Sequence, residues 1–274
     1  MYPPRLGCSS ISFRHQPLPE ALRTMRELGF QEIDLGALPG VCDHVPYVLD
    51  EAAVDRVAAD VRASGLRVRS VNGDVGDLNA VLDEERRTER AEHLDMLLRL
   101  TAAVGADALV LPCGALDHEP IRSLEEDVRT VAAELAGASG RAAAAGVGLW
   151  CESLHFFRLC WNEDRAQRLA DELEGTGVGV VMDFSHIVAS GGDPVRFVET
   201  FSDRIAHVHL RDATAGDINL SIGNGDADFA SGLQALERTG YTGHFSLELE
   251  TRDVTHEQRP EAARAAAEYI SSLL

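Results

Sequence analysis

The sequence has 274 residues, 45% hydrophobic and 26% charged, which is enough to bury the core of one large α/β domain. Acidic residues outnumber basic ones 45 to 25, and a formal net charge of −20 disfavours nucleic acid and anionic membrane surfaces as partners. All 25 basic residues are arginine, which excludes mechanisms that need a lysine amine, such as Schiff-base aldolases and Walker-type phosphate loops.

No segment approaches the ~18 consecutive apolar residues of a membrane helix. The first residues, MYPPRLGCSSIS, place no apolar stretch behind a basic end, so we expect a cytoplasmic protein without a membrane partner. The five cysteines are scattered and form no CxxC pair, which argues against a disulfide framework or a zinc ribbon.

Short runs rich in valine, isoleucine and leucine alternate with longer amphipathic stretches along the whole chain. A glycine stands where most of the helical stretches should stop, directly before the next strand run. We predict strands over 6–11, 31–36, 66–72, 107–113, 147–152, 177–183, 205–210 and 244–249. We predict helices over 19–29, 51–64, 84–104, 120–145, 163–173, 193–200, 228–239 and 258–273.

Eight predicted βα units favour an α/β fold with a single (β/α)8 TIM barrel over residues 1–274, a fold that typically takes ~250 residues. A doubly wound sheet would need a glycine-rich turn after the first strand, and the segment SFRHQPLPE that follows it has none. No break in composition marks a linker, so we expect one domain.

Polar residues stand at the ends of the last four predicted strands, where TIM barrels carry their chemistry. These residues are Glu152, Asp183, His209 and Glu248, with Glu250 as the alternative on the last strand because it has the same parity. Oxygen and nitrogen donors without a thiolate favour one divalent ion, manganese, magnesium or cobalt rather than zinc. Four successive strand ends of this kind predict a metal site.

Polar and apolar residues alternate along the seventh predicted strand. His207, His209 and Arg211 share one face, and Val208 and Leu210 take the other. The apolar face should meet the outer helices, which directs the histidine face into the barrel. His207 lies deeper than His209, so we expect it to be a packed, hydrogen-bonded interior residue.

His186 follows Asp183 by three residues and is expected on the loop after the strand. It could be a second ligand, a substrate contact or a helix cap, and we favour substrate contact. Sugar pockets often have aromatic walls, and we select Trp161 with Phe156 as the pair that forms one here.

The segment 221–229, SIGNGDADF, contains two closely spaced glycines. A loop after the seventh strand of a barrel often cradles phosphate. No basic residue is nearby in sequence, so we favour a simple turn followed by an aspartate that caps the next helix.

The stretch MDFSH, HVHLRD, GNGDADF and GYTGHFSLELE, within residues 182–250, resembles the xylose isomerase-like barrel superfamily. That superfamily holds sugar isomerases, ketose 3-epimerases, hydroxypyruvate isomerase, inosose and dehydroshikimate dehydratases, and endonuclease IV. The resemblance extends over nearly the whole chain and implies one metal held by Glu152, Asp183, His209 and Glu248, with His186 on the substrate. It also implies a homo-oligomer, because family members commonly form dimers or tetramers.

The chain departs from two branches of this family. The nuclease branch uses extra histidines, whereas strands three and four here end in VNGDVGD and LPCG, and no Asp-x-His follows HVHLRD. The epimerases place an arginine six residues after the metal histidine, where this chain has Ala215, so Arg211 or Arg158 would have to replace it. In the dehydratases a polar residue after the strand-five glutamate positions substrate, and His155 keeps that reaction open.

Three carboxylates around one divalent ion leave a formal charge of about −1, and no arginine cluster is evident at these strand ends. We therefore expect a neutral polyol, ketose or cyclic hydroxyketone as substrate. The metal would make the proton next to a carbonyl acidic, with Glu152 and Glu248 as general base and acid. The prediction is a metal-dependent sugar isomerase or epimerase of carbohydrate metabolism; a dehydratase of a cyclic hydroxyketone stays open, and a nuclease or a non-catalytic carbohydrate-binding protein is less favoured.

Overall fold

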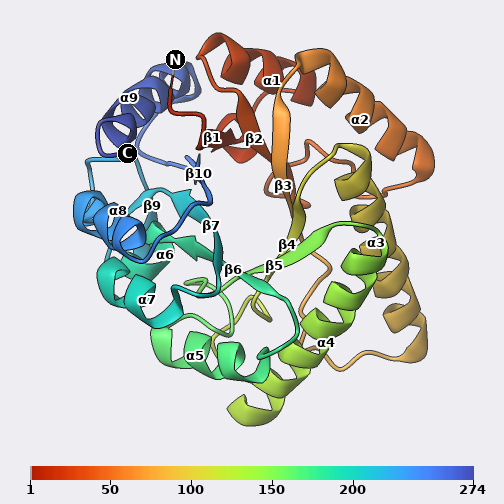
Figure 1. The fold of residues 1–274 in the computed structure, drawn as a ribbon. Coiled ribbons are helices and arrows are strands. Elements are labelled where there is room, and N and C mark those ends of the chain that lie inside the picture. Colours follow the sequence, from red (N-terminus) through yellow and green to blue (C-terminus); the bar gives the residue numbers. More distant parts are fainter. Residues whose placement is uncertain (1) are drawn as a thin grey trace.

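The computed structural model describes residues 2–274, which form a closed barrel of parallel strands. The strands lie in the order β1-β10-β7-β6-β5-β4-β3-β2, so each strand pairs with its neighbour in sequence and β10 pairs with β1 (Figure 1). This confirms the predicted (β/α)8 fold. The barrel strands are β1 (Leu6–Ser9), β2 (Glu32–Ala37), β3 (Arg67–Gly73), β4 (Ala108–Pro112), β5 (Gly148–Glu152), β6 (Gly179–Asp183), β7 (Ile205–Leu210) and β10 (His244–Leu247).

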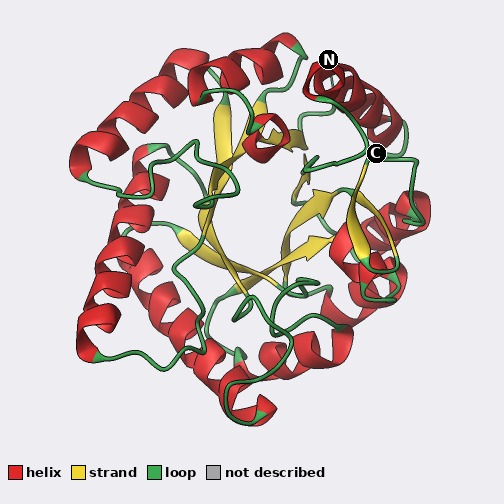
Figure 2. Ribbon diagram, turned by 180° about the vertical axis from the view of Figure 1, so that it is seen from behind, coloured by secondary structure: helices red, strands yellow, loops and turns green. Residues whose placement is uncertain are grey.

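Helices form an outer ring around these strands in both views of the molecule (Figures 1 and 2). The eight predicted helices are all present, with boundaries set by their caps; the fourth begins at 124 rather than 120 because Ser123 and Glu126 form a capping box. They are α1 (Leu18–Glu27), α2 (Glu51–Ser64), α3 (Glu84–Ala103), α4 (Leu124–Ala144), α5 (Glu163–Glu172), α7 (Pro194–Phe201), α8 (Phe229–Arg238) and α9 (Arg259–Ser271).

Several short elements that the sequence did not predict follow the carboxyl ends of strands. A short helix, α6 (Phe184–Ala189), begins directly after β6, and a hairpin of β8 (Asp212–Thr214) and β9 (Asp217–Leu220) follows β7. The first strand ends at Ser9 rather than at 11 because the chain turns into the 3₁₀ helix η1 (Ser10–Phe13). A second 3₁₀ helix, η2 (His256–Gln258), precedes α9. These elements build the rim of the barrel.

The seventh strand shows how the barrel combines a polar interior with an apolar surround. Val208 and Leu210 are fully buried members of the hydrophobic core. His207 and His209 are equally buried but both contact Asp34 of β2, with β1 and β10 between the two strands in the barrel order. The predicted division of faces is therefore confirmed: the histidine face points across the barrel interior.

The amino ends of three strands are joined by a charged cluster. Glu32 opens β2 and its side chain is only 2% exposed. It accepts hydrogen bonds from Arg69 Nη2 at 2.7 Å and His244 Nδ1 at 2.7 Å, and Arg67 Nη2 lies 2.9 Å away. We assign these charge pairs to stability, since the chemistry of TIM barrels lies at the other end. No helix within 2–274 is long and apolar enough to cross a membrane.

Candidate metal centre and cavity

A cavity of about 690 Å³ opens at the carboxyl ends of the strands. Its size lies in the range of pockets that bind small molecules. Strand ends supply its polar floor, and the loops after β2, β4 and β5 supply a largely apolar wall. The floor includes Asn72, Glu152, His186, Arg211 and Glu248, and the wall includes Leu38, Pro39, Val41, Leu116 and Phe157.

Four of the predicted site residues meet at this floor. One ligand atom each of Glu152, Asp183, His209 and Glu248 lies within 4.8 Å of the others. The four come from the ends of β5, β6 and β7 and from the residue after β10, as the sequence predicts. Three carboxylates and one imidazole form a donor set that suits a divalent cation, so the residues present fit a metal ion.

The two carboxylate oxygens of Asp183 have different contacts. Oδ1 caps α6 by accepting hydrogen bonds from the backbone N–H of Ser185 at 2.6 Å and of His186 at 3.2 Å, and from Ser185 Oγ at 2.6 Å. Oδ2 remains on the side of the cluster, 3.5 Å from Arg211 Nη2. The cap thereby leaves one oxygen of Asp183, Oδ2, facing the cluster.

His209 turns Nδ1 toward the cluster. This nitrogen lies 3.2 Å from Glu152 Oε1 and 3.6 Å from Glu248 Oε2. Burial lowers the pKa of His209, but the charges of Glu248, Asp34 and Glu152 outweigh burial and hold that pKa well above its ordinary value. The surrounding negative charge is therefore in excess, which is the condition a bound cation would relieve.

The two glutamates of the last strand have different surroundings. Glu248 is 6% exposed and belongs to the cluster, where burial and the charges of Glu152 and Asp183 raise its pKa to about 8. Glu250 instead forms ion pairs with Arg14 and, at 3.2 Å, with Arg211 Nη1. Of the two glutamates that strand parity allowed, Glu248 is therefore the one that belongs to the cluster.

His186 and His155 stand beside Glu152, their ring centroids 3.9 Å apart. Nδ1 of His186 accepts the backbone N–H of Phe156 at 3.1 Å, so the neutral ring carries its proton on Nε2, which lies 3.9 Å from both Glu152 and Asp183. Burial is the main cause that lowers the pKa of each histidine to about 3. Both rings are therefore neutral hydrogen-bonding groups in the cavity, and His186 lies on α6 rather than on a loop.

Arginines also line this cavity, so the expectation that the rim lacks an arginine cluster does not hold. Arg158 and Arg252 stand in the loops that follow β5 and β10, six residues after Glu152 and four after Glu248, while Arg211 follows β7 directly. Arg211 is 1% exposed and bonds Ser185 and Glu250, and Arg158 donates to Asp74 Oδ2 at 2.6 Å. The charges of Arg158 and Arg211 are thus balanced by carboxylates.

The aromatic wall differs from the predicted pair. Trp161 does not line the cavity but stacks on His118, which does, with centroids 4.8 Å apart. Phe157, rather than Phe156, reaches the cavity. Sequence reasoning also missed Asn72, whose Nδ2 donates to Glu248 Oε1 at 3.4 Å. Its place near the end of β3 is the same signal that identified Glu152.

The glycine-rich loop has no room for phosphate. Asp212 accepts the backbone N–H groups of Gly223 at 2.8 Å, Gly225 at 3.0 Å and Ala227 at 3.1 Å, the groups a phosphate would need. Asp228 then caps α8 by accepting the N–H of Ser231 at 2.9 Å. The preferred interpretation of a turn followed by an aspartate cap is confirmed.

The sequence matches the xylose isomerase-like TIM barrel family over residues 22–273. The chain belongs to that family. Its curated relatives include the rhizopine catabolism protein MocC of Rhizobium meliloti, 29% identical over 85% of this chain and 75% of the relative. They also include the 3-dehydro-D-guloside 4-epimerase of Escherichia coli, 23% identical over 98% of this chain and 97% of the relative.

Two further proteins are similar to this chain over a shorter range or by fold. The inosose dehydratase of Geobacillus thermodenitrificans is 29% identical over 39% of this chain and 42% of its own length. The crystal structure of the IolI protein with a bound zinc atom superposes with a TM-score of 0.80 at 19% identity, covering 98% of this chain and 99% of that one. The similarity to the IolI structure, at 19% identity, concerns the fold alone.

Proposed function

We propose that this protein is a divalent-metal-dependent epimerase or isomerase of a sugar, ketose or related polyhydroxy carbonyl compound. The observation that carries the proposal is the convergence of Glu152, Asp183, His209 and Glu248 within 4.8 Å at the floor of the cavity. The family and its 3-dehydro-D-guloside 4-epimerase member support the same reaction class.

The proposed ligands are these four residues, and a divalent ion held by them would make the proton next to a substrate carbonyl acidic. Glu152 and Glu248 are the two ligands that also line the cavity, so they are the groups placed to take that proton and return one. His186 and His155 offer neutral imidazoles to substrate hydroxyl groups. Proton return to the opposite face gives an epimer, and return to the neighbouring carbon gives an isomer.

Neutral polyols, ketoses and cyclic hydroxyketones are the proposed substrates, because Arg158 and Arg211 are already paired with carboxylates. Manganese, magnesium and cobalt are the proposed ions. Zinc is included in the test because the IolI structure holds it. The acidic surface, with a net charge of −20, supports the absence of nucleic acid among the partners.

The first prediction concerns metal content per chain, measured by inductively coupled plasma mass spectrometry after equilibration with each ion. We expect about one ion in the wild type and loss of it in Asp183→Ala and His209→Ala, because each variant removes one of four ligands. Glu248→Gln should weaken binding, whereas Glu250→Gln should retain the ion since Glu250 pairs with arginines. No ion in the wild type would refute the proposal.

The reaction is then followed by ¹H NMR in D₂O with keto-sugars and cyclic hydroxyketones. Exchange of deuterium into the carbon next to the carbonyl, followed by an epimer or isomer, is the expected result. Glu152→Gln should abolish exchange while a Glu250→Gln enzyme continues to exchange. A panel without any exchange in the metal-loaded wild type would count against proton abstraction.

A dehydratase is the second candidate, favoured by His155, whose Nε2 lies 3.8 Å from Glu152 Oε2, and by the inosose dehydratase relative. A dehydratase would remove the same proton but expel a β-hydroxyl group. The product would be a conjugated enone with a new ultraviolet absorbance, which separates the two reactions in one cuvette.

We also propose that the protein works in the cytoplasm as a homo-oligomer. The five cysteines are buried and free, which suits a reducing compartment. Light scattering coupled to size-exclusion chromatography gives the mass of the assembly, and a mass equal to 29.6 kDa would contradict the oligomer.

A further inference from the structure

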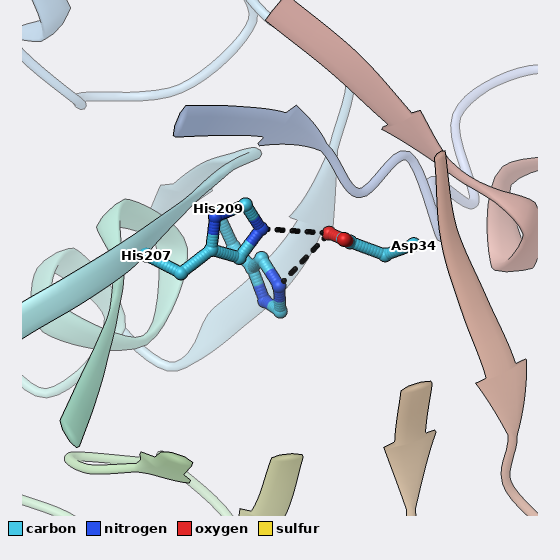
Figure 3. Close-up of side chains that lie close together, drawn as sticks. All are labelled: Asp34, His207 and His209. Atoms are coloured by element: carbon cyan, nitrogen blue, oxygen red, sulfur yellow. Dashed lines mark hydrogen bonds and ion pairs between the residues drawn. The ribbon is translucent and has the colours of Figure 1, made fainter. Parts of the chain in front are cut away.

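A buried cluster of Asp34, His207 and His209 (Figure 3) shares His209 with the proposed metal site. Asp34 is 0% exposed and stands on β2, whereas both histidines belong to β7. Figure 3 shows the two imidazoles converging on the one carboxylate. The contact crosses the barrel interior, since β1 and β10 separate the two strands along the sheet.

The two nitrogens of His209 face opposite ways. Nδ1 faces the carboxylates of Glu152 and Glu248, and Nε2 faces Asp34 Oδ2 at 3.5 Å. Within residues 2–274, Nε2 of His209 has no hydrogen bond of standard geometry, although the ring is fully buried. Asp34 is therefore the acceptor available to this N–H, and such contacts are often long before the ligand binds.

Asp34 is itself held in place by His207. Nε2 of His207 lies 2.8 Å from the same oxygen, Oδ2, that His209 faces. Trp150 stacks on the His207 ring with centroids 5.5 Å apart, which fixes that ring in turn. The 2.8 Å distance between His207 and Asp34 is that of an ordinary N–H···O hydrogen bond, so His207 holds the Asp34 carboxylate in place.

The geometry points to Asp34 as a positioning residue that orients His209 so that Nδ1 is presented to the metal. A ligand histidine generally donates its second ring N–H to an acceptor, which fixes the tautomer and the ring plane and makes the ligating nitrogen more basic. Asp34 supplies that acceptor from the opposite side of the barrel. The inference rests on the proposed metal site and adds a residue outside its four ligands.

The test compares Asp34→Asn with Asp127→Asn by Mn²⁺ titration calorimetry. Asp127 is a matched control, a fully buried aspartate whose partners are Asn79 and Arg122. We expect Asp34→Asn to weaken Mn²⁺ binding about 10-fold, because the amide oxygen still accepts a hydrogen bond but no longer carries the charge that makes the ligating nitrogen more basic. Asp127→Asn should bind as the wild type does. Unchanged affinity in Asp34→Asn would overturn the inference.

A second measurement needs no Asp34 variant. In the Zn²⁺-loaded wild type, imidazole ¹⁵N NMR should show His209 with an unprotonated Nδ1 and with a protonated, slowly exchanging Nε2. The signals of His209 are assigned because they disappear in His209→Gln. The opposite tautomer would overturn the inference, as would a second equivalent of metal that disappears in His207→Gln. Failure of the wild type to bind any ion refutes the proposed function itself, whereas normal binding with unchanged Asp34→Asn affinity refutes only the role of Asp34.

Discussion

At the scale of single residues, the site assigns a fixed direction to each side-chain nitrogen or oxygen. Nδ1 of His186 is engaged by the backbone of Phe156, so only Nε2–H is available to a substrate. The buried surroundings that lower its pKa to about 3 also keep the ring neutral. His186 is therefore suited to donate a hydrogen bond rather than to carry a charge.

This gives a prediction with a built-in comparison. His186→Asn keeps an acceptor near the place of Nδ1 but removes the Nε2 donor, whereas His186→Gln keeps a donor near the place of Nε2. We expect kcat/KM to fall about 10-fold in His186→Asn, the effect of losing one hydrogen bond of about 1.4 kcal/mol to a substrate hydroxyl group, and to fall less in His186→Gln. Metal content should stay at the wild-type value in both, and equal losses in the two variants would contradict the assigned direction.

At the scale of elements, the rim and the outer helices tolerate change very differently. Gly225 is in the loop whose N–H groups bind Asp212, and a Cβ there would collide with Asp212 and with the backbone of Ala213. Gly140 is exposed near the end of α4, and a Cβ there would meet no atom within 4 Å. The same substitution should therefore act in opposite directions at these two places.

We expect Gly140→Ala to raise the free energy of unfolding by about 0.5–1 kcal/mol, because alanine loses less backbone entropy in a helix. Gly225→Ala should lower it, since either the loop or Asp212 must move. Thermal unfolding followed by circular dichroism measures both, and 1 kcal/mol corresponds to about 2–4 °C in a chain of this size. A rise in Tm for Gly225→Ala would contradict the loop geometry.

The boundary between what the sequence predicts and what it misses also lies at this scale. The strand and helix runs of the barrel were predictable because each is long and carries its own apolar period and caps. The four clustered residues were predictable because parallel strands place their carboxyl ends at one edge. The helix α6 was not, because its six residues are too short to show a helical period even though Asp183 caps it locally. The β8–β9 hairpin was not either, because Asp212 at its start binds N–H groups eleven or more residues later in the chain.

Asp34 and Phe157 mark the same limit within the site. Asp34 stands mid-strand between Ile33 and Leu35, and only the closure of the barrel brings it opposite His207 and His209. Phe157 and Trp161 are both aromatic residues of one loop, and the path of that loop decides which of them reaches the cavity. Both facts depend on distant parts of the chain.

At the scale of the whole molecule, the carboxyl ends of the strands carry the cavity and the amino ends carry a cluster of charge pairs. Glu32 joins three strands at the amino end through Arg69, Arg67 and His244. Burial raises the pKa of Glu32, but hydrogen bonds from His244 and Arg69 outweigh burial and leave that pKa below its ordinary value. The ionised form is thus favoured by folding, and its stabilisation is present above the unfolded pKa and is lost as the pH falls through the folded one.

We therefore expect Glu32→Gln to destabilise the fold by about 2 kcal/mol at pH 7, because Arg69, whose side chain is 13% exposed, loses one of its carboxylate partners. The difference from the wild type should shrink as the pH falls below about 4.3, where the unfolded carboxylate itself takes a proton. Urea unfolding at pH 7 and at pH 4 measures it. Glu237→Gln, a change at an exposed glutamate, is the control, and a difference that grows in acid would contradict the sign.

The carboxylate of Asp212 has a consequence for how the rim responds to its surroundings. A side chain attached to the chain competes for the N–H groups of Gly223 and Gly225 at an effective concentration of millimolar or more, and it cannot diffuse away. Free phosphate or sulfate in a buffer, or on a metabolite, has to displace a tethered rival. The loop should hold one shape whatever anions the solution contains, so this part of the rim is set before any substrate arrives.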